Sequence, residues 1–180
     1  VIQTAPNRRP EISKLEASPG TLGPGETTTV TATASDPEGA NLDYFWHLPS
    51  GWTKSGSGKQ VTLTAARVYN QSQSVGVTVT DPKGASTTKQ TTVSMVSNAA
   101  PQIQSVSATS NPVLQNAQTT VTAVADDPYG DSLTYSWSLD DSAWSVSGNG
   151  DTITLQAPDA AASSVNVTVE VDDGHGQKVT

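Results

Sequence analysis

Carboxylate and amide side chains that could bind calcium occur in two groups in this 180-residue sequence. Ca²⁺ takes about six to eight oxygen ligands, which come from carboxylates, amides and carbonyls. Carboxylates held at one point would also repel one another unless a cation lay between them. The larger group comprises Asn98, Asp126, Asp127, Asp131, Asp172 and Asp173, and the smaller comprises Asn7, Asp36 and Asp81. The sequence therefore predicts calcium as the candidate cofactor, with the larger group as the first place to look.

The same aspartates also carry a turn signal that requires no metal. The run Asp-Pro-x-Gly begins at Asp36, at Asp81 and at Asp127. In a type I turn the first aspartate accepts a backbone hydrogen bond, and glycine suits the fourth position. Turn formation alone is therefore an alternative explanation for these residues, and at this point both explanations stay open.

Catalytic chemistry finds no support in the residue types. The sequence has two histidines and no cysteine. Hydrolysis needs a nucleophile beside a base, or a pair of carboxylates in a cleft. His47 directly follows Trp46, so a Trp46 in the core sends His47 to solvent, and His175 lies in the tight Gly174–Gly176 hairpin. We therefore expect that the chain is not an enzyme.

The four tryptophans divide into two pairs with different expected roles. Trp46 and Trp137 lie in alternating strand segments and are expected in the core. Trp52 and Trp144 follow turns, so each either caps an edge of its domain or lies exposed. An exposed indole face can stack on a sugar ring or on an extracellular protein ligand. Trp52 and Trp144 are therefore the candidate ligand-binding residues, with edge capping as the alternative.

All of these residues lie in two copies of one module. The segment that begins at Thr29 recurs at Thr120, about 91 positions later (120 minus 29). The recurring segments keep one order along the chain: Asn7–Ile12 with Asn98–Ile103, Thr29–Gly39 with Thr120–Gly130, Leu42–Trp46 with Leu133–Trp137, Gln60–Leu63 with Thr152–Leu155, and Val77–Gly84 with Val169–Gly176. A shared order with a single one-residue shift indicates a duplication.

Within each copy the apolar residues alternate with a period of two, as in half-buried strands. Val30, Ala32 and Ala34 alternate with threonine and serine, and turn signals separate such segments. The first copy contains about seven of them, near residues 11–17, 27–35, 42–48, 51–54, 60–65, 73–80 and 85–95. The sequence predicts an all-β chain of two tandem seven-stranded β-sandwiches, at residues 1–97 and 98–180, with the last strand of the second truncated.

Three motifs in both copies resemble the Ig-like and PKD-like modules of bacterial secreted and surface proteins. They are the Asn-x-x-Pro-x-Ile opening, the Asp-Pro-x-Gly-x-x-Leu-x-Tyr-x-Trp centre and the Val-x-Val-x-Asp-x-x-Gly close. PKD domains proper continue Trp-x-Phe-Gly-Asp-Gly, whereas this chain reads Trp46-His-Leu-Pro-Ser-Gly51, so the resemblance is to PKD-like modules. In an Ig-like sandwich the loops after the second and sixth strands share one end with the start of the domain. That arrangement would bring the members of each acidic group together.

Composition excludes several classes of partner. The net charge is −8 and the nine lysines and arginines are scattered, so a nucleic-acid partner is not expected. No segment reaches the ~20 consecutive apolar residues of a membrane-spanning helix, so membrane insertion by this segment is not expected either. Without cysteine there is neither a disulfide nor a thiolate metal site.

The resemblance implies a role outside the cell, as a stalk or accessory unit of an adhesin, lipoprotein, protease or polysaccharide-degrading enzyme. We expect a non-catalytic spacer in a larger bacterial chain, secreted, at the cell surface or in the periplasm, whose partners are the neighbouring domains. Calcium at the larger acidic group would stiffen the connection near Val96–Pro101. The alternative is an accessory module that binds polysaccharide or an extracellular protein through Trp52 and Trp144.

Overall fold

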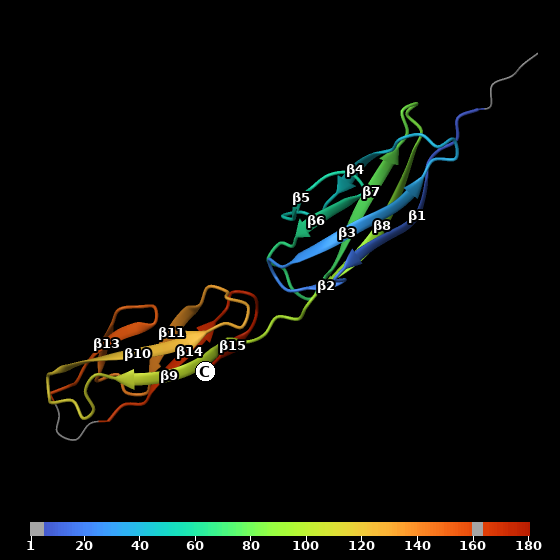
Figure 1. The fold of residues 1–180 in the computed structure, drawn as a ribbon. Coiled ribbons are helices and arrows are strands. Elements are labelled where there is room, and N and C mark those ends of the chain that lie inside the picture. Colours follow the sequence, from blue (N-terminus) through green and yellow to red (C-terminus); the bar gives the residue numbers. More distant parts are fainter. Residues whose placement is uncertain (1–5, 160–163) are drawn as a thin grey trace, which may run out of the picture. The chain divides into compact units, whose positions relative to one another are not determined.

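The computed structural model describes residues 6–159 and 164–180 and divides into two compact units. Unit one is Val1–Ser97 and unit two is Asn98–Thr180. All regular structure in the described ranges is β-strand, as Figure 1 shows. Across these ranges there is no helix with the length and apolarity needed to span a membrane.

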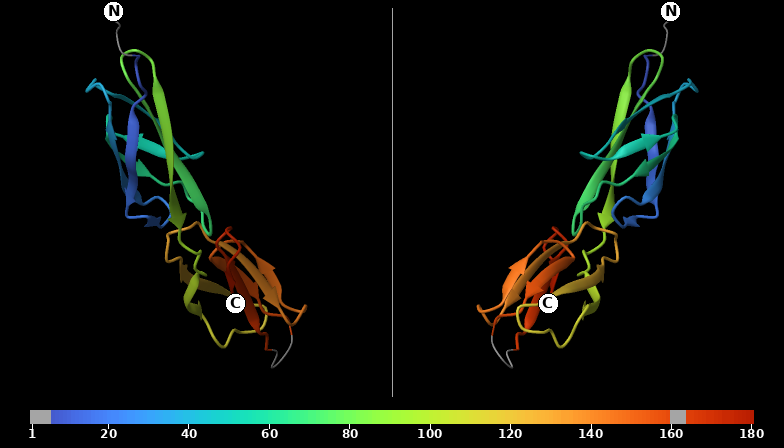
Figure 2. Two further views of the ribbon diagram at one scale, coloured as in Figure 1. Left: turned by 90° about the vertical axis from the view of Figure 1, so that its right-hand side faces the viewer. Right: turned by 90° about the vertical axis from the view of Figure 1, so that its left-hand side faces the viewer.

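Unit one is a sandwich of two four-stranded sheets. Its described residues form β1 (Glu11–Ser18), β2 (Thr21–Leu22), β3 (Thr27–Ser35), β4 (Asp43–His47), β5 (Thr53–Ser55), β6 (Gln60–Thr64), β7 (Ser72–Thr80) and β8 (Ser86–Met95). One sheet has the order β1-β3-β6-β5 and the other has the order β2-β8-β7-β4. Figure 2 shows the two layers from further sides, with β1 and β3 in blue and β7 and β8 in green.

The core of unit one consists of the inward-facing residues of the alternating strands. Val30 of β3 and Val77 of β7 lie in one buried cluster with Trp46. Trp46 is 7% exposed, and its Nε1 donates a hydrogen bond to the Gly58 carbonyl at 3.0 Å. A buried indole whose N–H has a partner adds a large apolar surface to the core without a polar penalty. Trp46 is therefore a core residue, as its place in the alternating segment predicts.

Unit two has the same two-layer plan. Its described residues form β9 (Gln102–Ala108), β10 (Gln118–Asp126), β11 (Thr134–Leu139), β12 (Ser145–Ser147), β13 (Thr152–Gln156), β14 (Val167–Asp172) and β15 (Lys178–Val179). The sheets have the orders β12-β13-β10-β9 and β11-β14-β15. Trp137 packs against the core, and its Nε1 donates to the Gly150 carbonyl at 2.9 Å, as Trp46 does in unit one. The prediction of an all-β chain with two β-sandwiches is confirmed.

The two units differ in their last strand and in the short segment that pairs with it. In unit one, β2 pairs in parallel with the end of β8, and Leu22 is 1% exposed there. The sequence does not predict β2, because two residues are too few to show an alternation. In unit two, β15 has only two residues, and Leu114 in the corresponding loop before β10 is 81% exposed. Among its described residues, unit two therefore has none of the strand contacts that cover this part of the core in unit one.

Candidate functional site

Four aspartates follow strand ends and cap the loops there: Asp36, Asp81, Asp127 and Asp173. In each loop, Oδ1 of the aspartate accepts hydrogen bonds from the backbone N–H groups two and four residues further on, at 2.7–3.2 Å. The glycine three residues after each aspartate has φ between 69° and 94°, which glycine adopts without strain. Turn chemistry therefore accounts for the Asp-x-x-Gly pattern in all four loops.

An asparagine before the first strand of each unit is hydrogen-bonded to the second of these loops. Asn7 Nδ2 donates to Asp81 Oδ2 at 2.8 Å, and Asn98 Nδ2 donates to Asp173 Oδ2 at 2.7 Å. Both aspartates are buried, at 4% and 2% exposure. We call each pair an Asn–Asp latch. The latch ties the start of a unit to the hairpin between its last two strands, 74 or 75 residues further along the chain.

The latched aspartates both have lowered pKa values. For Asp81 the largest cause is the hydrogen bond from Asn7, and backbone N–H groups of the same loop lower the pKa further. For Asp173 burial is the largest influence and raises the pKa, but the loop N–H groups and Asn98 together outweigh it. Both side chains are therefore carboxylates in the folded protein at neutral pH.

Asp126 and Asp172 are not part of the latched loops. They are the last residues of β10 and β14, directly before the loop aspartates. Since successive strand side chains point to opposite faces, a buried Asp173 places Asp172 on the outer face. Asp172 Oδ2 lies 3.0 Å from Lys178 Nζ, and Asp126 accepts a hydrogen bond from Gln104 Nε2 at 2.7 Å. The structure therefore does not bring all six residues of the larger group together.

The remaining members of the larger group lie in or beside the two capped loops of unit two. The Asp131 side chain is 2% exposed, and its Oδ1 is 3.8 Å from His175 Nε2. Two buried oxygens, Asp127 Oδ2 and Asn98 Oδ1, accept no hydrogen bond, and Asp36 Oδ2 is in the same state in unit one. Within residues 6–159 and 164–180, no group of three or more acidic or histidine side chains is arranged to hold a metal ion. Calcium therefore stays a prediction, without a preformed set of ligands.

Trp52 lies in the core of unit one and not on its surface. It is 6% exposed and belongs to the same buried cluster as Leu63 and Val75. It ends a turn that its N–H closes with a hydrogen bond to the Pro49 carbonyl at 3.2 Å. Its Nε1 is buried and has no hydrogen-bond partner. A buried ring offers no face to a ligand, so Trp52 is a core aromatic and not a binding platform.

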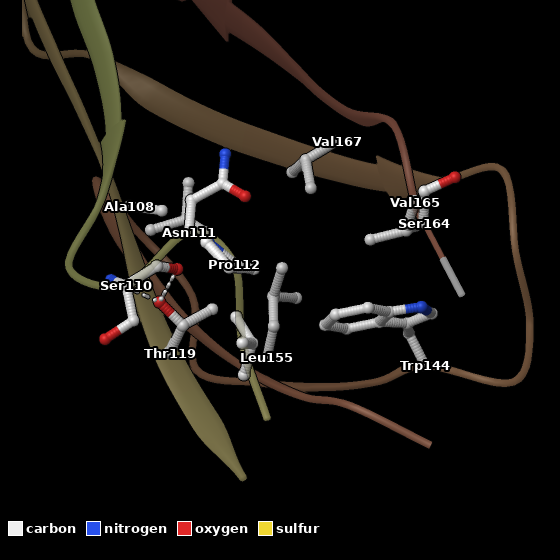
Figure 3. Close-up of a pocket in the computed structure, with 12 residues that line it drawn as sticks. Ala108, Ser110, Asn111, Pro112, Thr119, Trp144, Leu155, Ser164, Val165 and Val167 are labelled. Atoms are coloured by element: carbon white, nitrogen blue, oxygen red, sulfur yellow. Dashed lines mark hydrogen bonds between the residues drawn. The ribbon is translucent and has the colours of Figure 1, made fainter. Parts of the chain in front are cut away.

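Trp144 forms one wall of a cavity in unit two, and its indole points into that cavity (Figure 3). The cavity measures about 330 Å³. The indole is partly buried and packs against a cluster that includes Ile153 and Leu155. Elsewhere on the wall, Thr119 Oγ1 donates to the Ser110 carbonyl at 3.0 Å. Trp144 is thus engaged mainly in packing, although it borders open space.

Sequence reasoning did not single out the most exposed aromatic residue, Phe45, which is 67% exposed on β4. Its ring meets the His47 imidazole edge to face, with centroids 5.1 Å apart and 73° between the planes. His47 Nε2 is 2.7 Å from Thr78 Oγ1 on β7, and that hydroxyl is 2.8 Å from Thr88 Oγ1 on β8. The alternation of side chains along this strand could have predicted the exposure of Phe45 and His47, because a buried Trp46 requires both of its neighbours to point outward.

Residues 7–94 match the family described as bacterial Ig domain, so unit one is a member of that family. This confirms the resemblance seen in the repeated motifs, and Ig-like modules are non-catalytic. A particular protein is similar over more of the chain: chitinase A of Pseudoalteromonas piscicida is 36% identical over 173 residues, which are 94% of this chain. The chain covers 20% of that chitinase, so it spans about a fifth of the longer protein.

Solved structures similar to the chain include a pair of titin domains and a bacterial adhesin. The titin domains Z1Z2, solved in complex with telethonin, are 15% identical with a TM-score of 0.47, covering 97% of this chain and 94% of that one. The adhesin InvE of Yersinia pseudotuberculosis is 14% identical with a TM-score of 0.38, covering 92% of this chain and 56% of that one. The assignment of the fold rests on the strand pairing described above and not on these scores.

Proposed function

We propose that the chain is a non-catalytic spacer in a longer bacterial protein that acts outside the cell, secreted, at the cell surface or in the periplasm. The observation that carries this proposal is the short connection between the units. Val96 is held in unit one, because its N–H donates to the Leu22 carbonyl at 2.9 Å. Asn98 is held in unit two by its latch to Asp173. Residues 96–101 alone join β8 to β9, and a connection of this length has little reach.

The described side chains also support a non-catalytic role. Glycoside hydrolysis uses a pair of carboxyl groups on either side of the scissile bond. The cavity beside Trp144 is lined by hydroxyl, amide and apolar side chains, and none of the described lining residues is ionisable. The buried carboxylates Asp81 and Asp173 accept hydrogen bonds from their own loops instead of facing that cavity. The similarity to chitinase A covers a fifth of that protein, which is compatible with an accessory part of an enzyme.

A module exchange tests the spacer role. The chain is placed in a secreted chitinase between the catalytic domain and a separate substrate-binding domain, and hydrolysis of insoluble chitin is measured. Exchanging both units for an unrelated pair of bacterial Ig domains of equal length is expected to keep the rate within about twofold, because a spacer supplies length and not contacts. Removing unit two alone is expected to lower that rate and to leave hydrolysis of soluble oligosaccharides unchanged.

The opposite pattern would contradict the spacer role. If the unrelated pair abolishes the gain on insoluble chitin while unit one alone preserves it, then contacts made by unit one matter and length does not. Hydrolysis of soluble oligosaccharides is the control for an intact catalytic domain in every variant.

Accessory binding of a polysaccharide is a second candidate role, and the exposed Phe45 favours it. Trp52 is buried and Trp144 is engaged in packing, so neither offers a free ring face. Because the similar protein is a chitinase, we propose insoluble β-linked polysaccharide as the ligand class. Retention of the full chain on insoluble chitin tests this role, and complete recovery of the protein in the supernatant would rule it out.

For unit two we also propose calcium binding by the four members of the larger acidic group that lie in or beside the capped loops, Asn98, Asp127, Asp131 and Asp173, which would fix Asn98 more firmly at the start of the unit. The buried oxygens Asp127 Oδ2 and Asn98 Oδ1, which accept no hydrogen bond, support it, and so does the buried carboxylate of Asp131. An ion would have to compete with the loop N–H groups, so we expect a Kd of about 10⁻⁴–10⁻³ M, as in extracellular modules. Calorimetric titration with CaCl₂ checks this, with Asp127→Asn as the weakened variant; no heat at millimolar calcium would contradict it.

A further inference from the structure

We propose that the outer face of the β4–β7–β8 sheet in unit one binds an uncharged polysaccharide of equatorially linked sugars, of the kind found in chitin and cellulose. This inference rests on the accessory-binding role and assigns its site. The strand register brings the outward side chains into five rows, of which four hold no acidic or basic residue and the fifth, at the edge beyond Phe45, holds Asp43, Thr80 and Ser86. We call the four rows without charged residues the outer face: Phe45, His47, Ser72, Ser74, Gly76, Thr78, Thr88, Gln90, Thr92 and Ser94.

Phe45 gives the outer face an apolar ring on which a sugar can stack. A single exposed apolar residue is ordinary on a protein surface, so its neighbours decide what it can do. The His47 imidazole contacts the phenyl ring edge to face and supports it in this orientation. An aromatic ring held in one orientation can cover the C–H face of a pyranose and remove both surfaces from water.

Hydrogen bonds arrange the polar side chains beside Phe45 before a ligand arrives. His47 Nε2 is bonded to the Thr78 hydroxyl, which is bonded in turn to the Thr88 hydroxyl. Ser74 Oγ donates to Gln90 Oε1 at 3.1 Å in the neighbouring rows. Hydroxyl and amide groups held in place in this way lose little conformational entropy when they bind the hydroxyl groups of a sugar.

Gly76 keeps the middle of the outer face low. It lies between His47 and Gln90, and a Cβ atom there would be 3.3 Å from Gln90 Cγ and 3.5 Å from His47 Cβ. Because glycine has no side chain, both neighbours lean over Gly76 close to the sheet, and Gly76 itself is buried. The outer face can therefore present its aromatic and polar groups together to an extended chain of sugars.

The charge of the outer face fits a neutral ligand. None of its ten residues is an aspartate, glutamate, lysine or arginine, and the adjoining row beyond Phe45 adds a single carboxylate, Asp43, to a chain whose net charge is −8. In unit two, Glu170 takes the place of Thr78 in the row of Phe45, and Lys178 in the next row forms ion pairs of 2.7 Å with Glu170 and 3.0 Å with Asp172. A charged glycan would need cationic partners that the outer face lacks, whereas a neutral sugar needs apolar contact and hydrogen bonds. Only unit one therefore carries the proposed site.

Depletion isotherms of the full chain on insoluble β-chitin and on microcrystalline cellulose test the assignment. Phe45→Ala is expected to weaken retention by about five- to tenfold, because the stacked ring is lost. Phe45→Tyr keeps the ring and is expected to bind like the wild type. Val124→Ala, which trims a 52% exposed apolar residue of unit two, is the matched control and is expected to change nothing.

The outcomes separate the site from the role. A wild-type chain retained by neither polysaccharide would contradict the accessory role and the assigned face together. Retention that survives Phe45→Ala but is lost in Trp144→Ala would contradict only the assigned face and place binding at the cavity. Retention abolished by high salt would show an ionic contact and overturn the neutral ligand. Thermal melts check folding, and an exposed Phe45 predicts an unchanged Tm for Phe45→Ala.

Discussion

Replacing Asp173 with alanine is expected to destabilise unit two by about 2–3 kcal/mol. The change removes three hydrogen bonds at once, from the His175 N–H, the Gln177 N–H and Asn98 Nδ2. It leaves these donors around a site where the aspartate is only 2% exposed, so water cannot fully replace the lost acceptor. Urea unfolding followed by tryptophan fluorescence measures the loss.

Asp126→Ala is the matched control for this prediction. Asp126 is an exposed carboxylate of the same unit that bonds to the Gln104 side chain, so its removal is expected to cost at most about 0.5 kcal/mol. Asp173→Asn keeps an oxygen for the loop but sets a second amide against Asn98, so its loss is expected to be intermediate. An Asp173→Ala protein as stable as Asp126→Ala would show that the latch contributes nothing.

The latches also give the stability a pH dependence. The pKa values of Asp81 and Asp173 are lowered in the folded protein, so folding favours their ionised forms. That contribution is fully present above the ordinary value of 3.8 and is lost as the pH falls through the lowered folded values. We expect a Tm that is level from about pH 7 to pH 5 and falls below about pH 4, less steeply in Asp173→Ala.

Extending the last strand of unit two is expected to raise the Tm of that unit by about 5–10 °C. The extension is a copy of Lys89–Val96 placed directly after Thr180. In unit one, Val93 and Met95 of this segment are 0% and 6% exposed. Their copies would enter the cavity beside Trp144 and remove apolar surface from water, at the entropic cost of ordering the added residues. Scanning calorimetry and hydrogen exchange along β14 measure the effect.

The register of β15 determines where the extension starts. Val179 lies opposite Val171, as Thr87 lies opposite Val79 in unit one, so a copy that begins with Lys89 continues the same pairing. The control is the same extension with serine in place of the copies of Val93 and Met95. Equal stabilisation by both extensions, or none by either, would mean that the cavity does not receive these side chains.

Much of the fold could be predicted because the strands are half buried and their apolar residues alternate. The segment predicted near 85–95 is β8 at Ser86–Met95, and the segment predicted near 27–35 is β3 at Thr27–Ser35. β2 could not be predicted, because the burial of Leu22 depends on pairing with Met95 far along the chain. Local sequence carries no trace of such a pairing.

The candidate site was less predictable, because it depends on the direction of single side chains. Asp172 and Asp173 are adjacent in the sequence. Asp172 is bonded to Lys178 on the outward side of its sheet in unit two, whereas Asp173 is buried in a latch. A turn before Trp52 does not reveal whether the indole points inward, and it is 6% exposed. For Phe45 the signal was present, since alternation about a buried neighbour requires an outward ring.

The short connection between β8 and β9 has a consequence for how such chains lengthen. Each copy starts with an asparagine that is hydrogen-bonded to a hairpin of the same copy. The contacts that fix the start of a copy therefore lie within that copy. A gene duplication with breakpoints at this joint adds a complete building block and needs no new linker. Recombination can therefore change the length of the parent protein in equal steps of one whole copy.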